Sequence, residues 1–240
     1  MEQQQKHFWS QETLDWYSRA TAHGDYHARL AAFLAPWLSG GSVCDLGCGT
    51  GALSLALLQH IPAVTAIDQD PGALALLREQ AKSVPGLQVL EADAMALPTA
   101  SVWDHLLLSF FGRITVEDHL DYFLSHCRRQ LICIVNGGPK SSFSSTGSSA
   151  KHKEYVPQVA RFLDSRGLSY HLECHTLEFG QPLHDLEDAR AFVRRYSPPG
   201  CRELQDEALM ERLLPCPEGG YYLPSQMNLG IFVIEKGGAL

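Results

Sequence analysis

The chain has 240 residues, with 19 Lys and Arg against 27 Asp and Glu, and a formal net charge of −8. Hydrophobic residues make up 45% and charged residues 19%, which is typical of a folded globular protein and excludes a disordered or fibrous one. The acidic balance argues against a surface built for the phosphate backbone of nucleic acid, which requires clustered Lys and Arg.

Apolar residues at helical spacing predict helices over 8–38, with a break at Gly24. A regular alternation of strands and helices follows. The predicted strands cover 42–46, 63–67, 87–90, 103–109 and 131–135, and the predicted helices cover 52–60, the segment that Asp70 and Pro71 open, and 115–128. Because the fifth strand is apolar on both faces, this rhythm predicts an α/β doubly wound parallel sheet.

The alternation of predicted strands and helices becomes less regular after the fifth strand. Residues 137–150 contain six Ser and predict a loop, either a lid that orders on substrate binding or a mobile connection. Further predicted elements are a helix over 154–166, a strand over 168–179, helices over 185–196 and 202–214, and a strand over 227–235. We expect one domain over 1–240, with a helical cap over 1–38 and a helical addition on the substrate side over 180–226.

The cysteines and the apolar stretches exclude several classes of protein. Seven Cys without a C-x-x-C pair predict neither a disulfide framework nor a zinc site. His171 and Cys174 would face opposite sides of a strand, so no metal site is expected there. Pro62 and three Gly interrupt the longest uncharged stretch, 46–67, and residues 1–6 lack the order of a secretory signal. We therefore expect a cytoplasmic protein with no membrane partner.

The most informative segment places Gly47, Gly49 and Gly51 between a strand and a helix. Glycine permits a tight turn and the close approach of a ligand, and a helix N-terminus favours a carboxylate or a phosphate. Gly47, Gly49 and Ala52 also satisfy the loose G-x-G-x-x-A pattern of dinucleotide-binding turns. The turn therefore indicates a nucleotide-like cofactor without deciding which.

Asp45 favours one kind of cofactor. A carboxylate beside this turn would repel a pyrophosphate and attract an ammonium group, which indicates a cofactor that carries an amino acid. Asp68 lies 23 residues further on, where it can accept hydrogen bonds from both ribose hydroxyls, although this would suit a dinucleotide equally well. Asp93 could accept from an adenine amine while the amide of Ala94 donates to the ring.

Four motifs in register then resemble the class I S-adenosylmethionine-dependent methyltransferases of the small-molecule type. They are D-L-G-C-G-T-G from Asp45, A-I-D-Q-D-P from Ala66, E-A-D-A-M-A-L-P from Glu91 and W-D-H-L-L-L-S-F-F-G from Trp103. The resemblance covers roughly residues 25–136. It implies a Rossmann-like, seven-stranded sheet with the last strand antiparallel, helices on both faces, and S-adenosylmethionine bound across the carboxyl ends of the first strands.

The resemblance also assigns the binding residues. Asp45, Gly47, Gly49 and Gly51 would line the methionine moiety, Asp68 the ribose, Gln69, Asp93 and Ala94 the adenine, and Ser109 would offer its backbone near the methionine amine. Tyr17 resembles an aromatic residue that closes over the cofactor, and a tyrosine that only packs between helices is the alternative. No catalytic residue is assigned, because in-line positioning supplies much of the acceleration and a general base is optional.

The segment after the fourth strand bears on the methyl acceptor. Methyltransferases acting on base amines carry an acidic or Asn residue, two Pro and an aromatic residue there, whereas this chain has Ser109-Phe110-Phe111-Gly112. We therefore expect methyl transfer to a small-molecule O, N or C nucleophile, with S-adenosylhomocysteine as product and no nucleic-acid partner. The alternatives are a protein or RNA-related methyltransferase in a complex, and a non-catalytic regulatory subunit that binds the cofactor. The oligomeric state stays open.

Overall fold

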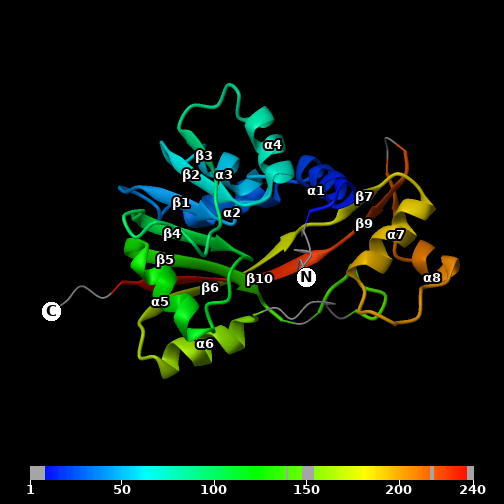
Figure 1. Cartoon of the computed structure of the whole chain (residues 1–240). Helices are drawn as coiled ribbons and strands as arrows, with labels where there is room; N and C mark the ends of the chain where they lie inside the picture. Colours follow the sequence, from blue (N-terminus) through cyan, green and yellow to red (C-terminus); the bar gives the residue numbers. More distant parts are fainter. Residues whose placement is uncertain (1–8, 139, 148–153, 217–218, 237–240) are drawn as a thin grey trace, which may run out of the picture. The chain divides into compact units, whose positions relative to one another are not determined.

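The computed structural model describes residues 9–138, 140–147, 154–216 and 219–236 (Figure 1). Its main sheet has seven strands in the order β3-β2-β1-β4-β5-β10-β6, and β10, the last strand of the chain, runs antiparallel. The predicted seven-stranded, doubly wound sheet is therefore confirmed. The strands are β1 (Val43–Leu46), β2 (Val64–Asp68), β3 (Leu87–Glu91), β4 (Trp103–Ser109), β5 (Cys127–Asn136), β6 (Tyr170–Glu178) and β10 (Gln226–Glu235).

The helices largely follow the predicted periodicity. The expected break at Gly24 separates the first two, and α4 begins as predicted, with Pro71 in its first turn and the Asp70 side chain accepting from the Ala73 N–H at 2.9 Å. The helices are α1 (Gln11–His23), α2 (Tyr26–Leu34), α3 (Ala52–Leu57), α4 (Pro71–Gln80), α5 (Glu117–Ser125), α6 (Val156–Ser165), α7 (Leu186–Tyr196) and α8 (Asp206–Met210).

The parallel register of the first strands places their carboxyl ends at one edge. In the ladder, Asp45 of β1 lies beside Ala66 of β2 and Leu107 of β4. β2 pairs with β3 in the same direction, with Asp68 opposite Glu91. The side chains that follow β1, β2, β3 and β4 therefore gather at this edge, where open α/β sheets bind their ligands.

The chain divides into two compact units. The first comprises residues 1–15, 27–133 and 233–240, and the second comprises residues 16–26 and 134–232. The first unit therefore contains β1 to β4 with α3 to α5 and all of α2 except Tyr26. The expected single domain with a cap over 1–38 and an addition over 180–226 stays a prediction.

The second unit contains a small antiparallel sheet that the sequence analysis missed. Its strands are ordered β7-β9-β8, with β7 at Gln181–Leu183, β9 at Tyr221–Leu223 and β8 at Leu214–Pro215. The helix expected over 202–214 is wrong in extent, because the structure has only the short α8 before β8. Figure 1 shows α7 and α8 beside this sheet. Strands of two or three residues carry too few alternations to be read from periodicity.

An aromatic core holds this part of the second unit together. The Trp16 and Phe192 rings meet edge to face, with centroids 5.2 Å apart, and Phe143 meets Phe192 in the same way at 4.9 Å. Phe143 belongs to the Ser-rich segment 137–150, part of which lies outside the described residues. The backbone N–H of Ser145 donates to Ser197 Oγ at 2.8 Å, so the described part of that segment is tied to the end of α7. Its role as a lid stays a prediction.

Candidate functional site

The turn after β1 is built from three glycines in left-handed backbone conformations. Gly47, Gly49 and Gly51 have φ values of 75°, 56° and 70°, which residues with a side chain rarely adopt. The N–H groups of Gly47 and Cys48 donate to the Ile67 carbonyl at 2.8 Å and 3.0 Å, and the Gly51 N–H donates to the Cys48 carbonyl at 2.9 Å. The turn is therefore fixed to the end of β2, and these N–H groups hold the backbone rather than offering themselves to an anion.

Side chains fill the space beside these glycines. A β-carbon at Gly47 would overlap the Phe111 ring, and one at Gly51 would overlap the side chain of Leu77. A β-carbon at Gly49 would lie 2.9 Å from Trp9 Cζ2. The sequence pattern predicts that the glycines make room for a ligand, whereas in this structure they also make room for two aromatic rings and a leucine.

Asp45 is a buried carboxylate with one oxygen unsatisfied. Its side chain is 1% exposed, and Ser54 Oγ donates to Oδ2 at 2.5 Å. Within the described part of the chain, Asp45 Oδ1 has no hydrogen-bond partner. Burial raises the pKa of Asp45 to about 6; the Ser54 hydrogen bond opposes this shift, and the nearby charge of Asp68 adds to it. A buried acceptor without a donor is costly, so Oδ1 fits a cofactor that brings an ammonium group.

Asp68 joins the glycine turn to the beginning of α4. Its Oδ2 accepts from the Gly49 N–H at 2.7 Å, and its Oδ1 accepts from the Asp70 N–H at 2.9 Å. Each carboxylate oxygen can accept a second hydrogen bond, so hydroxyl groups of a ligand remain compatible with this arrangement. The structural role of Asp68 could not be predicted from spacing alone.

The segment after β3 is attached to the same edge. The Ala92 N–H donates to the Asp68 carbonyl at 3.0 Å, and Asp93 Oδ1 accepts from the Met95 N–H at 2.9 Å. Asp93 is exposed, while Ala94 is buried, and Gln69 is exposed at the end of β2. Direct contacts thus connect the turn, Asp68 and the segment that carries Asp93 and Ala94.

β4 ends at Ser109, on the same edge, two residues beyond the pairing of Asp45 with Leu107. The next residue, Phe110, has a φ of 51° and is the only non-glycine residue with positive φ among those the structure describes. Its side chain is 41% exposed, although it is large and apolar. Such strained, exposed residues are common at functional sites, and here one sits next to Phe111, whose ring covers Gly47.

Tyr17 belongs to the second unit. Its ring lies edge-on to that of Phe179, with centroids 6.0 Å apart. The ring therefore packs against a residue that follows β6, and a contact of Tyr17 with a cofactor stays a prediction. Trp9 was not predicted as a site residue, because a single tryptophan ahead of the first helix carries no motif.

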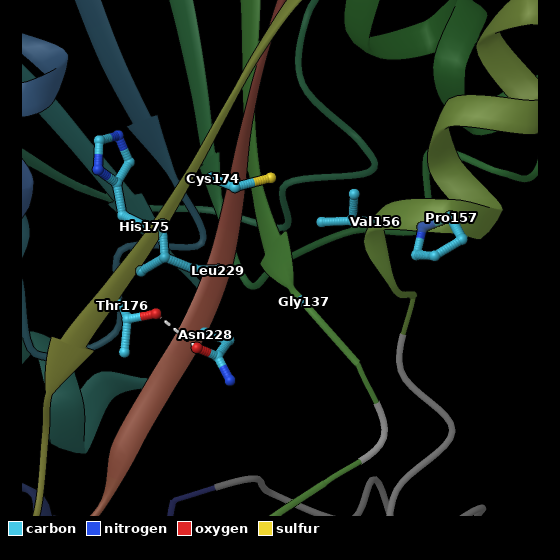
Figure 2. Close-up of a pocket in the computed structure, with 8 residues that line it drawn as sticks. All are labelled: Gly137, Val156, Pro157, Cys174, His175, Thr176, Asn228 and Leu229. Carbon is cyan, nitrogen blue, oxygen red and sulfur yellow. Dashed lines mark hydrogen bonds between the residues drawn. The ribbon is translucent and has the colours of Figure 1, made fainter.

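The second unit also has a cavity of about 200 Å³ (Figure 2). Thr176 Oγ1 donates to Asn228 Oδ1 at 2.6 Å, and Cys174 and His175 point to opposite sides of β6 in Figure 2. The cavity is lined by Gly137, Val156, Pro157, Cys174, His175, Thr176, Asn228 and Leu229. It contains none of the residues predicted to bind the cofactor.

The residues that the structure describes contain neither a clustered metal site nor a membrane-spanning helix. No group of three or more His, Cys, Asp or Glu side chains in those ranges is arranged to hold a metal ion. No helix there is long and apolar enough to cross a membrane.

Comparison with known sequences points to one family. Residues 43–132 match a family model described as a methyltransferase domain. The chain is 42% identical over 92 residues to ribosomal RNA small subunit methyltransferase A of Magnetococcus marinus, a match that covers 38% of this chain and 32% of that protein. It is 33% identical over 75 residues to the protein of the same name from Chlorobaculum parvum, covering 31% and 26%. The chain thus spans about a third or less of the curated relatives it matches.

Solved structures share the fold at low sequence identity. The protein YcgJ from Bacillus subtilis aligns with a TM-score of 0.56 and 12% identity, covering 88% of this chain and 99% of that one. Magnesium protoporphyrin IX methyltransferase from Synechocystis, crystallised with bound S-adenosylhomocysteine, aligns with a TM-score of 0.56 and 16% identity, covering 95% of both chains. At these identities the likeness concerns the fold.

Proposed function

We propose that the chain is a class I S-adenosylmethionine-dependent methyltransferase, and that it transfers a methyl group from S-adenosylmethionine to a small-molecule O, N or C nucleophile. The observation that carries the proposal is the unsatisfied, buried Oδ1 of Asp45 beside the glycine turn. A pyrophosphate would meet repulsion at this carboxylate, whereas the ammonium group of a methionine moiety supplies the missing donor.

The other predicted binding residues of the first unit each have a proposed role. Asp68 accepts from the ribose hydroxyls with the lone pairs left free by its two backbone hydrogen bonds. Asp93, Ala94 and Gln69 form the adenine end, and the backbone of Ser109 lies at the methionine end. Gly47, Gly49 and Gly51 keep the turn in the left-handed conformation on which the positions of the other residues depend.

The bound cofactor supplies an electrophilic methyl group on a sulfonium sulfur. The protein's task is to hold the acceptor in line with that group and to exclude water. The aromatic rings of Phe111 and Trp9 lie against the glycine turn and would form an apolar wall there. No side chain is assigned as a general base, because an acceptor that is unprotonated at the working pH needs none.

The proposal of a small-molecule methyl acceptor is based on the segment after β4 and on the net charge of the chain. Ser109 stands where methyltransferases acting on base amines carry an acidic or Asn residue, and Phe110 and Phe111 replace the two Pro that follow it there. The net charge of −8 gives no general attraction for RNA. The RNA-related alternative is favoured by one observation, namely the 42% identity over 92 residues to a ribosomal RNA methyltransferase. That match covers only 32% of the relative, so most of that protein lies outside the matched region.

The cofactor assignment is tested by calorimetric titration of S-adenosylmethionine and S-adenosylhomocysteine into wild type, Asp45→Asn and Glu79→Gln. Glu79 is an exposed carboxylate paired with Lys82 and serves as the matched control. We expect micromolar binding to wild type and Glu79→Gln, and at least tenfold weaker binding to Asp45→Asn. A wild type that binds neither ligand overturns the proposal, and NAD would then be titrated.

The acceptor is tested by incubating the protein with S-adenosylmethionine carrying a labelled methyl group. One reaction contains a low-molecular-weight cell extract, and another contains small ribosomal subunits. Label in small molecules supports the proposal, and label in RNA supports the alternative. Cofactor binding without labelled product in either reaction favours a regulatory subunit.

A further inference from the structure

We propose that Ser54 is a positioning residue of the cofactor site, whose hydroxyl keeps the buried Asp45 carboxylate charged and leaves Oδ1 directed at the cofactor's ammonium group. This inference rests on the proposed function. It adds a residue that neither the motifs nor the resemblance assigned.

The backbone fixes where the Ser54 hydroxyl lies. Ser54 is the third residue of α3, which begins directly after the left-handed Gly51, and it is fully buried. A serine within a helix commonly bonds back to a carbonyl of the preceding turn. Ser54 Oγ instead donates to Asp45 Oδ2 at 2.5 Å. A buried hydroxyl in the first turn of α3 thus donates to one oxygen of a buried carboxylate at the end of β1, and the other oxygen stays without a donor within the described part of the chain.

The other groups that face Asp45 do not favour its charge. Cys44 and Cys48 flank it on the same segment, and burial, with the charge of Asp45 as a further cause, raises the pKa of both thiols and keeps them neutral. Asp68 approaches from β2 and adds like charge, while the neighbour on β4 is the apolar Leu107. No Lys or Arg in the described ranges forms an ion pair with Asp45, so Ser54 is the group there that stabilises the carboxylate.

The protonation state of Asp45 determines how the affinity for the cofactor changes with pH. Asp45 attracts a cation only when it is deprotonated, so affinity for the cofactor rises with pH through the pKa of Asp45, near 6. Without the Ser54 hydroxyl the pKa rises further, and the pH at half-maximal affinity moves upward. The ligand's own α-amino group loses its proton only above about pH 8, so the rising limb reports on Asp45.

The test is S-adenosylhomocysteine binding between pH 5 and 8, because this ligand carries the amino acid but transfers no methyl group. Wild type is compared with Ser54→Ala, Ser54→Thr, which keeps the hydroxyl, and Glu79→Gln as a surface control. We expect Ser54→Ala to bind roughly tenfold or more weakly near pH 6.5, to recover partly towards pH 8, and to show an upward-shifted midpoint. Ser54→Thr is expected to keep the wild-type midpoint.

Equal weakening of Ser54→Ala at every pH, with the midpoint unchanged, would overturn the inference and leave Ser54 a packing residue. Absence of binding to wild type would overturn the proposed function instead. A second measurement needs no ligand, namely the titration of the Asp45 carboxyl carbon by NMR in wild type and in the Ser54 variants. A midpoint that does not rise in Ser54→Ala contradicts the inference whatever the ligand does.

Discussion

The Trp9 ring lies against Gly49, so close that a β-carbon on residue 49 would be 2.9 Å from Trp9 Cζ2. Gly49 is also the residue whose N–H binds Asp68, at 2.7 Å. The indole therefore covers the point where the glycine turn meets the carboxylate proposed to hold the ribose. A ligand that occupies this edge of the sheet must contact the indole or displace it.

The tryptophan fluorescence should report cofactor binding through Trp9. We expect S-adenosylhomocysteine to change the emission of wild type, and Trp9→Phe to lose most of that change. Trp103→Phe is the control, because Trp103 opens β4 at the opposite end from Ser109, with its Nε1 donating to Thr65 Oγ1 at 3.3 Å. A change that survives in Trp9→Phe and disappears in Trp103→Phe would show that the ligand binds elsewhere.

A comparison of Gly51→Ala with Gly40→Ala separates the cost of backbone strain from the cost of a steric overlap. The two glycines have φ values of 70° and 72°, so an alanine is strained by about 1 kcal/mol at either position. At Gly51 the new methyl group also overlaps Leu77, which is fully buried, whereas no described atom lies within 4 Å of the corresponding position at Gly40. We expect Gly51→Ala to lower the free energy of unfolding in urea by about 1–3 kcal/mol more than Gly40→Ala. Equal losses of unfolding free energy in the two variants would mean that the Leu77 side chain moves aside at no measurable cost.

The main sheet could be predicted because its strands, which have four to ten residues, are separated by clear helix signals. The Asp70-Pro71 pair marks the first turn of α4, and the apolar run at 131–135 marks the centre of β5. Parallel strands bring their carboxyl ends to the same edge of the sheet, so it was also predictable that Asp45 and Asp68 would both lie at that edge.

The features that were missed depend on tertiary contacts. The Trp9 ring packs against Gly49, and nothing in the sequence around Trp9 indicates that contact. The strands β7, β8 and β9 have two or three residues each and are held by pairing rather than by periodicity. The hydrogen bond from Ser54 to Asp45 joins residues nine positions apart through a turn whose path three left-handed glycines determine.

Asp188 is expected to matter for the stability of the second unit. It accepts from Trp16 Nε1 at 2.6 Å and from Arg19 Nη1 at 2.8 Å, and both members of its ion pair with Arg19 are less than a fifth exposed. Burial alone would raise the pKa of Asp188, but hydrogen bonds, that from Arg19 foremost, lower it. Asp188→Ala would remove the acceptor of the Trp16 indole N–H and the carboxylate partner of the Arg19 guanidinium, which keeps its hydrogen bond to the Pro182 carbonyl. We expect a cost of about 2–4 kcal/mol.

The matched control for Asp188 is Asp206→Ala, which removes the partner of Arg190 in a more exposed ion pair of the same unit. That change should cost much less than Asp188→Ala, because exposed ion pairs are well solvated. The measurement is the free energy of unfolding in urea of both variants, each compared with wild type. Similar losses for the two would show that the contacts of Asp188 with Trp16 and Arg19 contribute little.

The pH dependence of stability should identify Asp45 and His27 as opposing groups. The pKa of Asp45 is raised to about 6, so the folded state binds its proton more tightly, and stability falls as pH rises from about 4 to 6. Burial lowers the pKa of His27 to about 4, so stability rises with pH between about 4 and 6.5. Asp45→Asn removes the first effect, and we expect its stability relative to wild type to increase between pH 4 and 7, by about 3 kcal/mol at most. His27→Gln should change the slope in the opposite direction. A difference between Asp45→Asn and wild type that is constant with pH would mean that the Asp45 carboxyl titrates near its ordinary value in the folded protein.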